Sequence, residues 1–207
     1  MGPPGSGKGT QASGIAKKLN VESVSTGDLF RSHQTRQTEL GILAATYMER
    51  GEYVPDAVAI KIIMDWVVHP KRSKGFVLDG FPRTKTQAET LDKELCRYGG
   101  VDRVLLIDAP EVELVRRLTG RLSCKDCQAT YHVDHNLSSN NRKCEKCEGR
   151  LYRRSDDNSI VAKKRIQLYR KETSSVVEHY REIGKLKEIN GAEPMDTVAK
   201  NLLEAVE

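Results

Sequence analysis

Residues 2 to 11 read Gly-Pro-Pro-Gly-Ser-Gly-Lys-Gly-Thr-Gln and stand directly before a helical pattern. They fit the phosphate-loop pattern G-x-x-x-x-G-K, with one extra glycine between the lysine and the threonine. Glycines let consecutive backbone N–H groups turn inward around phosphate oxygens, and the dipole of the next helix attracts the same anion. We therefore predict a phosphate site formed by Gly5, Ser6, Gly7, Lys8, Gly9 and Thr10, with Lys8 reaching the β- and γ-phosphates. The alternative, a flexible turn, does not require a lysine at the start of a helix.

Strand and helix patterns alternate after this loop. Short apolar runs of strand length occur at 21–25, 76–79, 103–108 and 185–190. Helical patterns cover 9–19, 55–69, 84–98, 110–120 and 160–183, and a last helix starts near Pro194. In the second of these helices the predicted core stripe is Ala59, Ile62, Ile63, Trp66 and Val67. The alternation predicts an α/β fold with a doubly wound, mostly parallel sheet.

The composition is that of an ordinary globular domain. The chain has 207 residues, of which 38% are hydrophobic and 30% charged. Its longest apolar stretch, 57–68, is interrupted by Lys61 and Asp65 and is shorter than the roughly 20 residues of a membrane span. No signal-peptide pattern opens the sequence, so we expect a cytoplasmic, reducing compartment and no membrane partner. The charge is uneven: residues 116–170 carry a net charge of +8 and the rest of the chain −3, which favours one local anionic ligand.

Four of the five cysteines have the spacing of a structural zinc site. They form the pattern Cys124-x2-Cys127-x16-Cys144-x2-Cys147 within residues 121–158, a segment without helical periodicity. Four thiolates fill a tetrahedron, so the metal would hold shape without performing chemistry. Two disulfides are the alternative, which a reducing compartment disfavours. The remaining thiol, Cys96, is predicted to be a small buried side chain, and His132 and His135 to be structural or exposed.

Several motifs, taken in order, resemble the adenylate kinases. They are GPPGSGKGTQ (2–11), STGDLFR (25–31), LDGFPRTKTQ (78–87), R-x-x-x-R (117–121), and RRSDD (153–157) with the downstream KKR (163–165). The resemblance covers nearly the whole chain and points to the long-lid type whose lid carries a metal knot. It implies a P-loop core at 1–25, 56–120 and 159–207, a helical AMP-binding insertion at 26–55 and a zinc-binding lid at 121–158. The implied reaction is the reversible, Mg²⁺-dependent transfer ATP + AMP ⇌ 2 ADP.

The resemblance also assigns roles to individual residues. The catalytic set that it implies is Lys8, Asp79, Arg83, Arg121, Arg154 and Arg165. ATP would be held by the phosphate loop with Arg117 and Arg121, and Asp79, at the end of an apolar strand, would hold a water of hydrated Mg²⁺. The AMP-binding residues would be Thr26, Arg31, Val54, Gly80, Arg83, Gln87, Arg154 and Arg165.

Residue chemistry agrees with an AMP acceptor. Arg31 and Arg83 offer the planar, bidentate donors that suit a phosphate dianion. Gln87 lies four residues after Arg83, on the same helix face, and its amide offers a donor and an acceptor to an adenine edge. Relatives specific for uracil or cytosine usually have Asn directly after this arginine, where Thr84 stands here.

Two other functions remain open at this point. Within the same enzyme class, the donor could be GTP or the acceptor another nucleoside monophosphate. From a different class, a nucleic-acid-binding ATPase could use the four cysteines as a zinc ribbon, but aromatic side chains for base stacking are sparse around them and LDGFPRTKTQ would be unexplained. We therefore expect no nucleic-acid partner, only the substrates ATP, AMP and ADP, and a monomer.

The resemblance raises one expectation about the start of the sequence. In the fold that it implies, the phosphate loop follows a buried parallel strand, but only Met1 precedes Gly2. We expect Met1 to be the last residue of that strand, so that the first strand is truncated. We expect the strands at 76–79 and 185–190 to flank the resulting gap and either close it or pair with another molecule.

Overall fold

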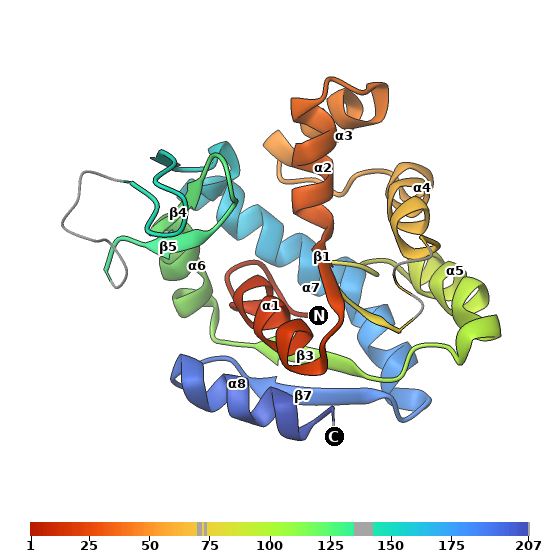
Figure 1. Cartoon of the computed structure of the whole chain (residues 1–207). Coiled ribbons are helices and arrows are strands. Elements are labelled where there is room, and N and C mark those ends of the chain that lie inside the picture. Colours follow the sequence, from red (N-terminus) through yellow and green to blue (C-terminus); the bar gives the residue numbers. More distant parts are fainter. Residues whose placement is uncertain (70–71, 73, 135–142, 207) are drawn as a thin grey trace.

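The computed structural model describes residues 1–69, 72, 74–134 and 143–206 (Figure 1). Its α-helices are α1 (Lys8–Leu19), α2 (Thr26–Thr35), α3 (Glu39–Glu49), α4 (Asp56–Val67), α5 (Lys85–Leu95), α6 (Glu111–Thr119), α7 (Ser159–Glu182) and α8 (Met195–Glu204). Its strands are β1 (Glu22–Ser25), β2 (Phe76–Asp79), β3 (Val104–Asp108), β4 (Arg121–Cys124), β5 (Thr130–His132), β6 (Leu151–Tyr152) and β7 (Leu186–Asn190). Short 3-10 helices are η2 (Cys96–Tyr98) and η3 (Ser155–Asp157).

The helices begin where local chemistry favours it. At the start of α3, α5 and α7, the side chains of Thr38, Thr84 and Asn158 accept a hydrogen bond from the backbone N–H three residues later. Such caps satisfy N–H groups that have no partner within the helix. Because these starts and the apolar periodicity are both visible in the sequence, the predicted helices and strands are confirmed to within a few residues.

The central strands form two parallel pairs instead of one continuous sheet. β1 pairs with β2 in a register that sets Ser25 opposite Asp79, and β3 pairs with β7, with Asp108 opposite Asn190. The prediction of an α/β fold with parallel strands is confirmed, but the single doubly wound sheet is not seen among the described residues. In Figure 1 one pair lies beside α1 and the other runs between α1 and α8.

A cavity of about 500 Å³ separates the two pairs. It is lined by all of β2, by residues of β3, and by apolar side chains of α1 and α5 such as Ile15, Leu91 and Leu95. We expected the strands at 76–79 and 185–190 to flank this gap. β2 does flank it, but β3 lines the other side, and β7 pairs with β3. Every residue of β2 remains half-buried, which is unusual for a strand inside a parallel sheet.

Met1 occupies one end of this cavity and pairs with β3. Its amino nitrogen donates to the carbonyl oxygen of Leu105 over 2.5 Å, and the Ile107 N–H donates to the carbonyl oxygen of Met1 over 3.1 Å. In a parallel ladder, one residue bonds the two residues on either side of its partner in the neighbouring strand. Met1 thus behaves as the last residue of a strand, as predicted, and burial lowers the pKa of its amino group to about 6.

Two predictions about single side chains need correction. Cys96 is exposed, because α5 gives way there to the short η2 and the thiol no longer faces the core. In α4, Ala59, Ile62, Ile63 and Val67 are buried as predicted, but Trp66 is half-buried, with its ring edge on Phe76 and the guanidinium of Arg72 over its face. None of the helices in the described ranges is both long and apolar enough to cross a membrane.

Candidate active site

The phosphate loop lies directly before α1 and packs on β3. Gly5 and Gly7 have φ angles of 86° and 88°, a backbone region that glycine adopts readily and that turns successive N–H groups inward. Gly2 packs so closely on β3 that a Cβ there would lie 2.2 Å from the Ile107 carbonyl oxygen. Lys8 donates to the Pro3 carbonyl oxygen over 3.2 Å, and its burial lowers the pKa of its ammonium group to about 8.

Asp79 faces this loop from the end of β2. Its Oδ1 atom is buried and has no hydrogen-bond partner among the described residues, and a Cβ on Gly9 would lie 3.1 Å from its Oδ2. Its backbone carbonyl accepts a hydrogen bond from Thr26 Oγ1 over 3.0 Å, which ties β2 to the start of α2. An unpartnered carboxylate oxygen beside a phosphate loop fits a hydrated Mg²⁺, because hard cations prefer oxygen ligands.

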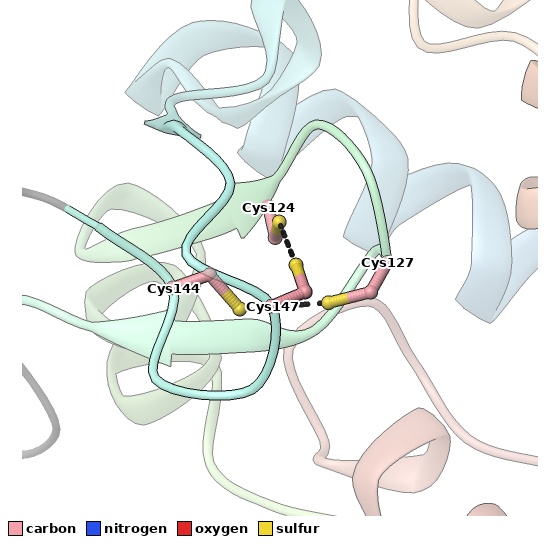
Figure 2. Close-up of side chains that lie close together, drawn as sticks. All are labelled: Cys124, Cys127, Cys144 and Cys147. Carbon is pink, nitrogen blue, oxygen red and sulfur yellow. Dashed lines mark hydrogen bonds between the residues drawn. The ribbon is translucent and has the colours of Figure 1, made fainter.

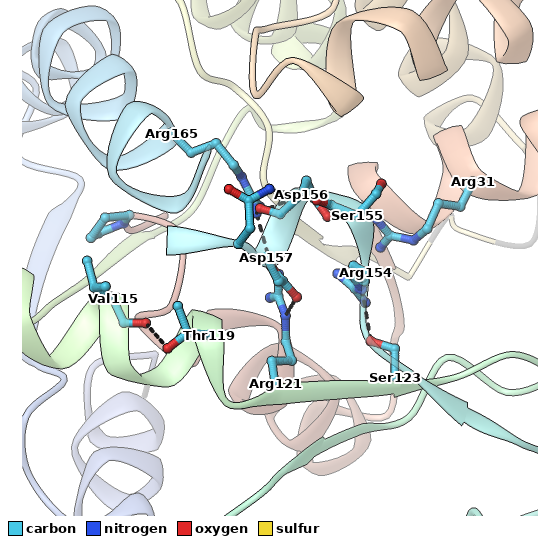
Figure 3. Close-up of polar contacts among 12 residues, drawn as sticks. Arg31, Val115, Thr119, Arg121, Ser123, Arg154, Ser155, Asp156, Asp157 and Arg165 are labelled. Carbon is cyan, nitrogen blue, oxygen red and sulfur yellow. Dashed lines mark hydrogen bonds and ion pairs between the residues drawn. The ribbon is translucent and has the colours of Figure 1, made fainter. Parts of the chain in front are cut away.

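Two arginines, one from β4 and one from α7, converge on two neighbouring aspartates (Figure 3). Arg121 at the start of β4 donates to Asp157 over 2.8 Å, and Arg165 of α7 lies 3.2 Å from Asp157 and 2.9 Å from Asp156. Asp157 is fully buried. Burial lowers the pKa of Arg165, whereas at Arg121 the hydrogen bonds and charge of Asp157 outweigh burial and raise it. The arginines remain charged and are held in fixed directions.

Arg154 joins this group from the segment after β6. Its Nε donates to the buried Ser123 Oγ over 2.8 Å, and its guanidinium lies 4.0 Å from Asp28 (Figure 3). Asp28 also forms an ion pair with Arg31 of α2. Burial, together with the charges of Arg121 and Arg31, lowers the pKa of Arg154 to about 10. Two arginines of the predicted AMP site therefore share one carboxylate, which sequence patterns alone did not indicate.

Arg83 and Gln87 follow β2 and are held by a network that includes Asp56. Arg83 Nε donates to the Gly80 carbonyl oxygen over 2.7 Å. The amide of Gln87 accepts from the Arg83 backbone N–H over 2.8 Å and donates to Asp56 over 2.7 Å. Asp56, at the start of α4, also accepts from Thr84 Oγ1. Gln87 is only 2% exposed, and its amide already has two protein partners. The expectation that it shares a helix face with Arg83 was wrong, because α5 begins at Lys85 and Arg83 lies before it.

A cavity of about 920 Å³ brings most of these groups together. Its lining includes residues of the phosphate loop, both predicted nucleotide sites and the lid: Gly5, Ser6, Gly7, Lys8, Gly9, Thr10, Thr26, Arg31, Val54, Asp79, Gly80, Arg83, Gln87, Arg117, Arg121, Arg154 and Arg165. Arg117, on the lid side, pairs with Glu113 and donates to the Gly191 carbonyl oxygen over 2.9 Å. All the predicted ATP-binding, AMP-binding and catalytic residues therefore line one cavity, which has room for two small ligands.

The four predicted zinc ligands form one cluster in the lid (Figure 2). Their four sulfur atoms all lie within 4.8 Å of one another, and Cys124 and Cys147, like Cys127 and Cys144, are 3.4–3.5 Å apart. These separations are far beyond the roughly 2.05 Å of a disulfide. With Zn–S bonds of about 2.3 Å, tetrahedral thiolates would be almost 4 Å apart, so the cluster fits zinc.

Side chains around the cluster support that fit. Tyr131 on β5 hydrogen-bonds the Cys144 sulfur over 3.2 Å. Burial opposes ionisation of this thiol, but hydrogen bonds, led by the one from Tyr131, lower its pKa to about 6. His132 is half-buried, lies near Arg116 and Asp134 and is not among the cluster's ligands, whereas His135 lies outside the described residues.

Comparisons with known proteins agree with this arrangement. The family model for adenylate kinase matches residues 1–185. An adenylate kinase of Desulfitobacterium hafniense is 45% identical over 208 residues, covering 100% of this chain and 96% of the relative. One of Symbiobacterium thermophilum is 44% identical over 207 residues with the same coverage, and one of Archaeoglobus fulgidus is 40% identical over 203 residues, covering 98% of this chain and 94% of that protein.

Proposed function

The chain belongs to the adenylate kinase family, and from this membership we propose how its residues carry a phosphoryl group from Mg·ATP to AMP. The observation that carries the proposal is the single cavity in which the phosphate loop, Arg83 and the lid arginines face one another. ATP binds with its phosphates on the phosphate loop and Lys8. AMP binds on the opposite wall, with its phosphate between Arg31 and Arg83.

Transfer between the two nucleotides requires alignment and charge neutralisation more than a general base. Lys8 and Arg83 approach the transferred group from the central strand pairs, and Arg121, Arg154 and Arg165 approach it from the lid and α7. Arginine is suited to this work because its planar fork binds two phosphate oxygens at once. Closure of the lid excludes the water that would otherwise hydrolyse ATP.

Mg²⁺ and zinc have separate duties in this proposal. The buried Oδ1 of Asp79 would hold a water of the Mg²⁺ that accompanies ATP, and this ion would supply positive charge beside the phosphates. Zinc, held by the four lid cysteines, keeps β4, β5 and β6 in place and takes no part in the chemistry.

For the acceptor base, we assign adenine to the surroundings of Thr26, Val54 and Gln87. Gln87 reaches the base with the amide N–H that Asp56 does not use. For the donor base, we assign Arg117, which the resemblance to the family places against the adenine of ATP. Because one chain lines the whole cavity, we propose a monomer as the active unit.

A coupled assay of ADP formation tests this function. ATP or GTP is supplied as donor, and AMP, CMP or UMP as acceptor, with and without added RNA. We expect rapid ADP formation only with ATP and AMP, and no effect of RNA. Equal rates with UMP would contradict the acceptor assignment, equal rates with GTP would contradict the donor assignment, and an RNA-dependent rate would favour an ATPase that acts on nucleic acid.

A further inference from the structure

The backbone carbonyl of Arg83 has a partner that the catalytic scheme does not use. Thr173 on α7 donates its hydroxyl proton to this oxygen over 3.0 Å. Thr173 is fully buried, so its hydroxyl has no access to water. A buried hydroxyl aimed at a loop carbonyl ninety residues away fixes the loop relative to the helix.

The same hydroxyl is itself held by Tyr53. The phenol oxygen of Tyr53 lies 3.0 Å from Thr173 Oγ1. Because a threonine hydroxyl has one proton, which goes to the Arg83 carbonyl, the proton between the two hydroxyls must come from Tyr53. Burial raises the pKa of Tyr53, which keeps its phenol protonated and able to donate. The chain of donors therefore runs from Tyr53 through Thr173 to Arg83.

Tyr53 also contacts the other end of Arg83. The guanidinium carbon lies 5.1 Å from the centre of the Tyr53 ring, within the range of a cation–π contact. Tyr53 thus contacts the charged head of Arg83 directly and its backbone through Thr173. With the bond to Gly80, this leaves the long side chain few alternative directions.

We propose that Tyr53 and Thr173 are positioning residues for Arg83, which they hold in the direction that catalysis requires. This inference rests on the proposed role of Arg83 at the transferred phosphate. It also gives Tyr53 a second duty, because its neighbour Val54 belongs to the AMP site and packs with α2, α3 and α4. Tyr53 thus links this apolar cluster to Arg83 through one phenol and one hydroxyl.

The test compares Thr173→Val and Thr173→Ser, with Thr90→Val as the matched control, since the Thr90 hydroxyl bonds only its own helix α5. We expect Thr173→Val to lower kcat/KM for AMP about tenfold, because both hydrogen bonds of the Thr173 hydroxyl are lost, while KM for ATP stays unchanged. Thr173→Ser, which restores the hydroxyl, should remain within about twofold of the parent, as should Thr90→Val. A lower melting temperature with unchanged kcat/KM would mean that Thr173 is only structural and would overturn the proposal.

Tyr53→Phe provides a second measurement that keeps the ring and removes only the phenol oxygen. We expect a loss of about threefold in kcat/KM for AMP, and the double variant with Thr173→Val should be no worse than Thr173→Val alone, because Tyr53's hydroxyl acts through Thr173. Additive losses would overturn the relay. If Thr173→Val does not fold, an unchanged kcat/KM for Tyr53→Phe alone decides against the proposal. Arg83→Ala distinguishes a failure of the proposed function from a failure of this inference. An unchanged kcat/KM in Arg83→Ala would contradict the proposed function. A severe loss of kcat/KM in Arg83→Ala, together with unchanged kcat/KM in the Tyr53 and Thr173 variants, would contradict this inference only.

Discussion

The lid sheet and the central strand pairs differ in what holds them together. The lid sheet is continuous in the order β5-β4-β6, but among the described residues the buried cluster beneath it consists of only Cys124, Tyr131, Cys144 and Leu151. The central pairs pack on larger apolar clusters from α1, α4, α5 and α8, yet they are separated by a cavity of about 500 Å³. The lid sheet is therefore continuous but buries little apolar surface, whereas the central strands bury more apolar surface but do not form one continuous sheet.

This difference indicates which changes to the chain should alter the stability of each region. Three strands with a core of two thiols and two other side chains bury little apolar surface, so we expect the lid to depend on a bound metal for its stability. The central pairs depend on apolar burial, and unfilled volume there costs stability because its lining atoms lack contacts. A filled cavity should therefore stabilise the centre, and loss of a cysteine should affect the lid.

The largest expected effect comes from an added strand in the central cavity. Five apolar residues placed directly before Met1 should extend its pairing along β3 and reach β2. At about 2 kcal/mol for each buried side chain, the free energy of unfolding should rise by up to about 10 kcal/mol, and ATP should bind more tightly. Denaturant unfolding and ATP titration measure both. A Gly-Ser-Gly-Ser-Gly extension is the matched control, and equal stability of the two extended chains would show that the cavity does not accept a strand.

The next largest effect concerns chemistry on the central side. Arg83→Ala should reduce kcat/KM about 1,000-fold, because it removes a cation from the transition state of phosphoryl transfer. Gln87→Ala should cost far less and mainly relax the choice between AMP and other monophosphates. Steady-state kinetics with AMP, CMP and UMP distinguish the two. Small and equal losses for both variants would argue against their assigned places in the AMP site.

A cysteine substitution tests the lid. Cys144→Ser should release zinc and lower the melting temperature by roughly 6 to 12 °C, which corresponds to about 3 kcal/mol, while kinase activity persists at low temperature. Cys96→Ser is the matched control, since that thiol is exposed and lies outside the cluster. Elemental analysis of protein purified without chelator checks the premise. A zinc-free parent protein, or a disulfide detected by mass, would remove it.

The smallest expected effect is a pH dependence at the phosphate loop. The pKa of Lys8 is lowered to about 8 by burial, and in the proposed site its charged form contacts the phosphates of ATP. Above pH 8, binding must first return a proton to Lys8, so ATP affinity should fall about tenfold between pH 7 and pH 9. Lys8→Arg stays charged over this range and should show a flat profile in the same titration. A parent profile as flat as that of the variant would contradict the lowered pKa.

Motifs and periodicity, together with the family resemblance, were enough to predict the order of the core strands and helices, the cysteine cluster and the residues that line the cavity, but not the lid strands β4, β5 and β6. They could not show the split between the strand pairs, because the gap depends on which strands are neighbours in space. They also missed Asp28, Asp56 and Asp157, because a single carboxylate in a polar segment has no periodic or spacing signal. Cys96 was wrongly predicted to be buried, since the change from α5 to η2 turns it outward.

Asp156 and Asp157 have a further consequence for nucleotide binding. Arg121 and Arg165 already hold carboxylate partners there, so nucleotide phosphates enter by exchange with protein carboxylates more than by displacing dissolved anions. Few small ions are then released on binding, and nucleotide affinity should fall less steeply with ionic strength than the number of arginines suggests. The buried carboxylates also reduce the electrostatic repulsion between neighbouring guanidinium groups before a nucleotide binds. The binding surface therefore keeps its arrangement between turnovers.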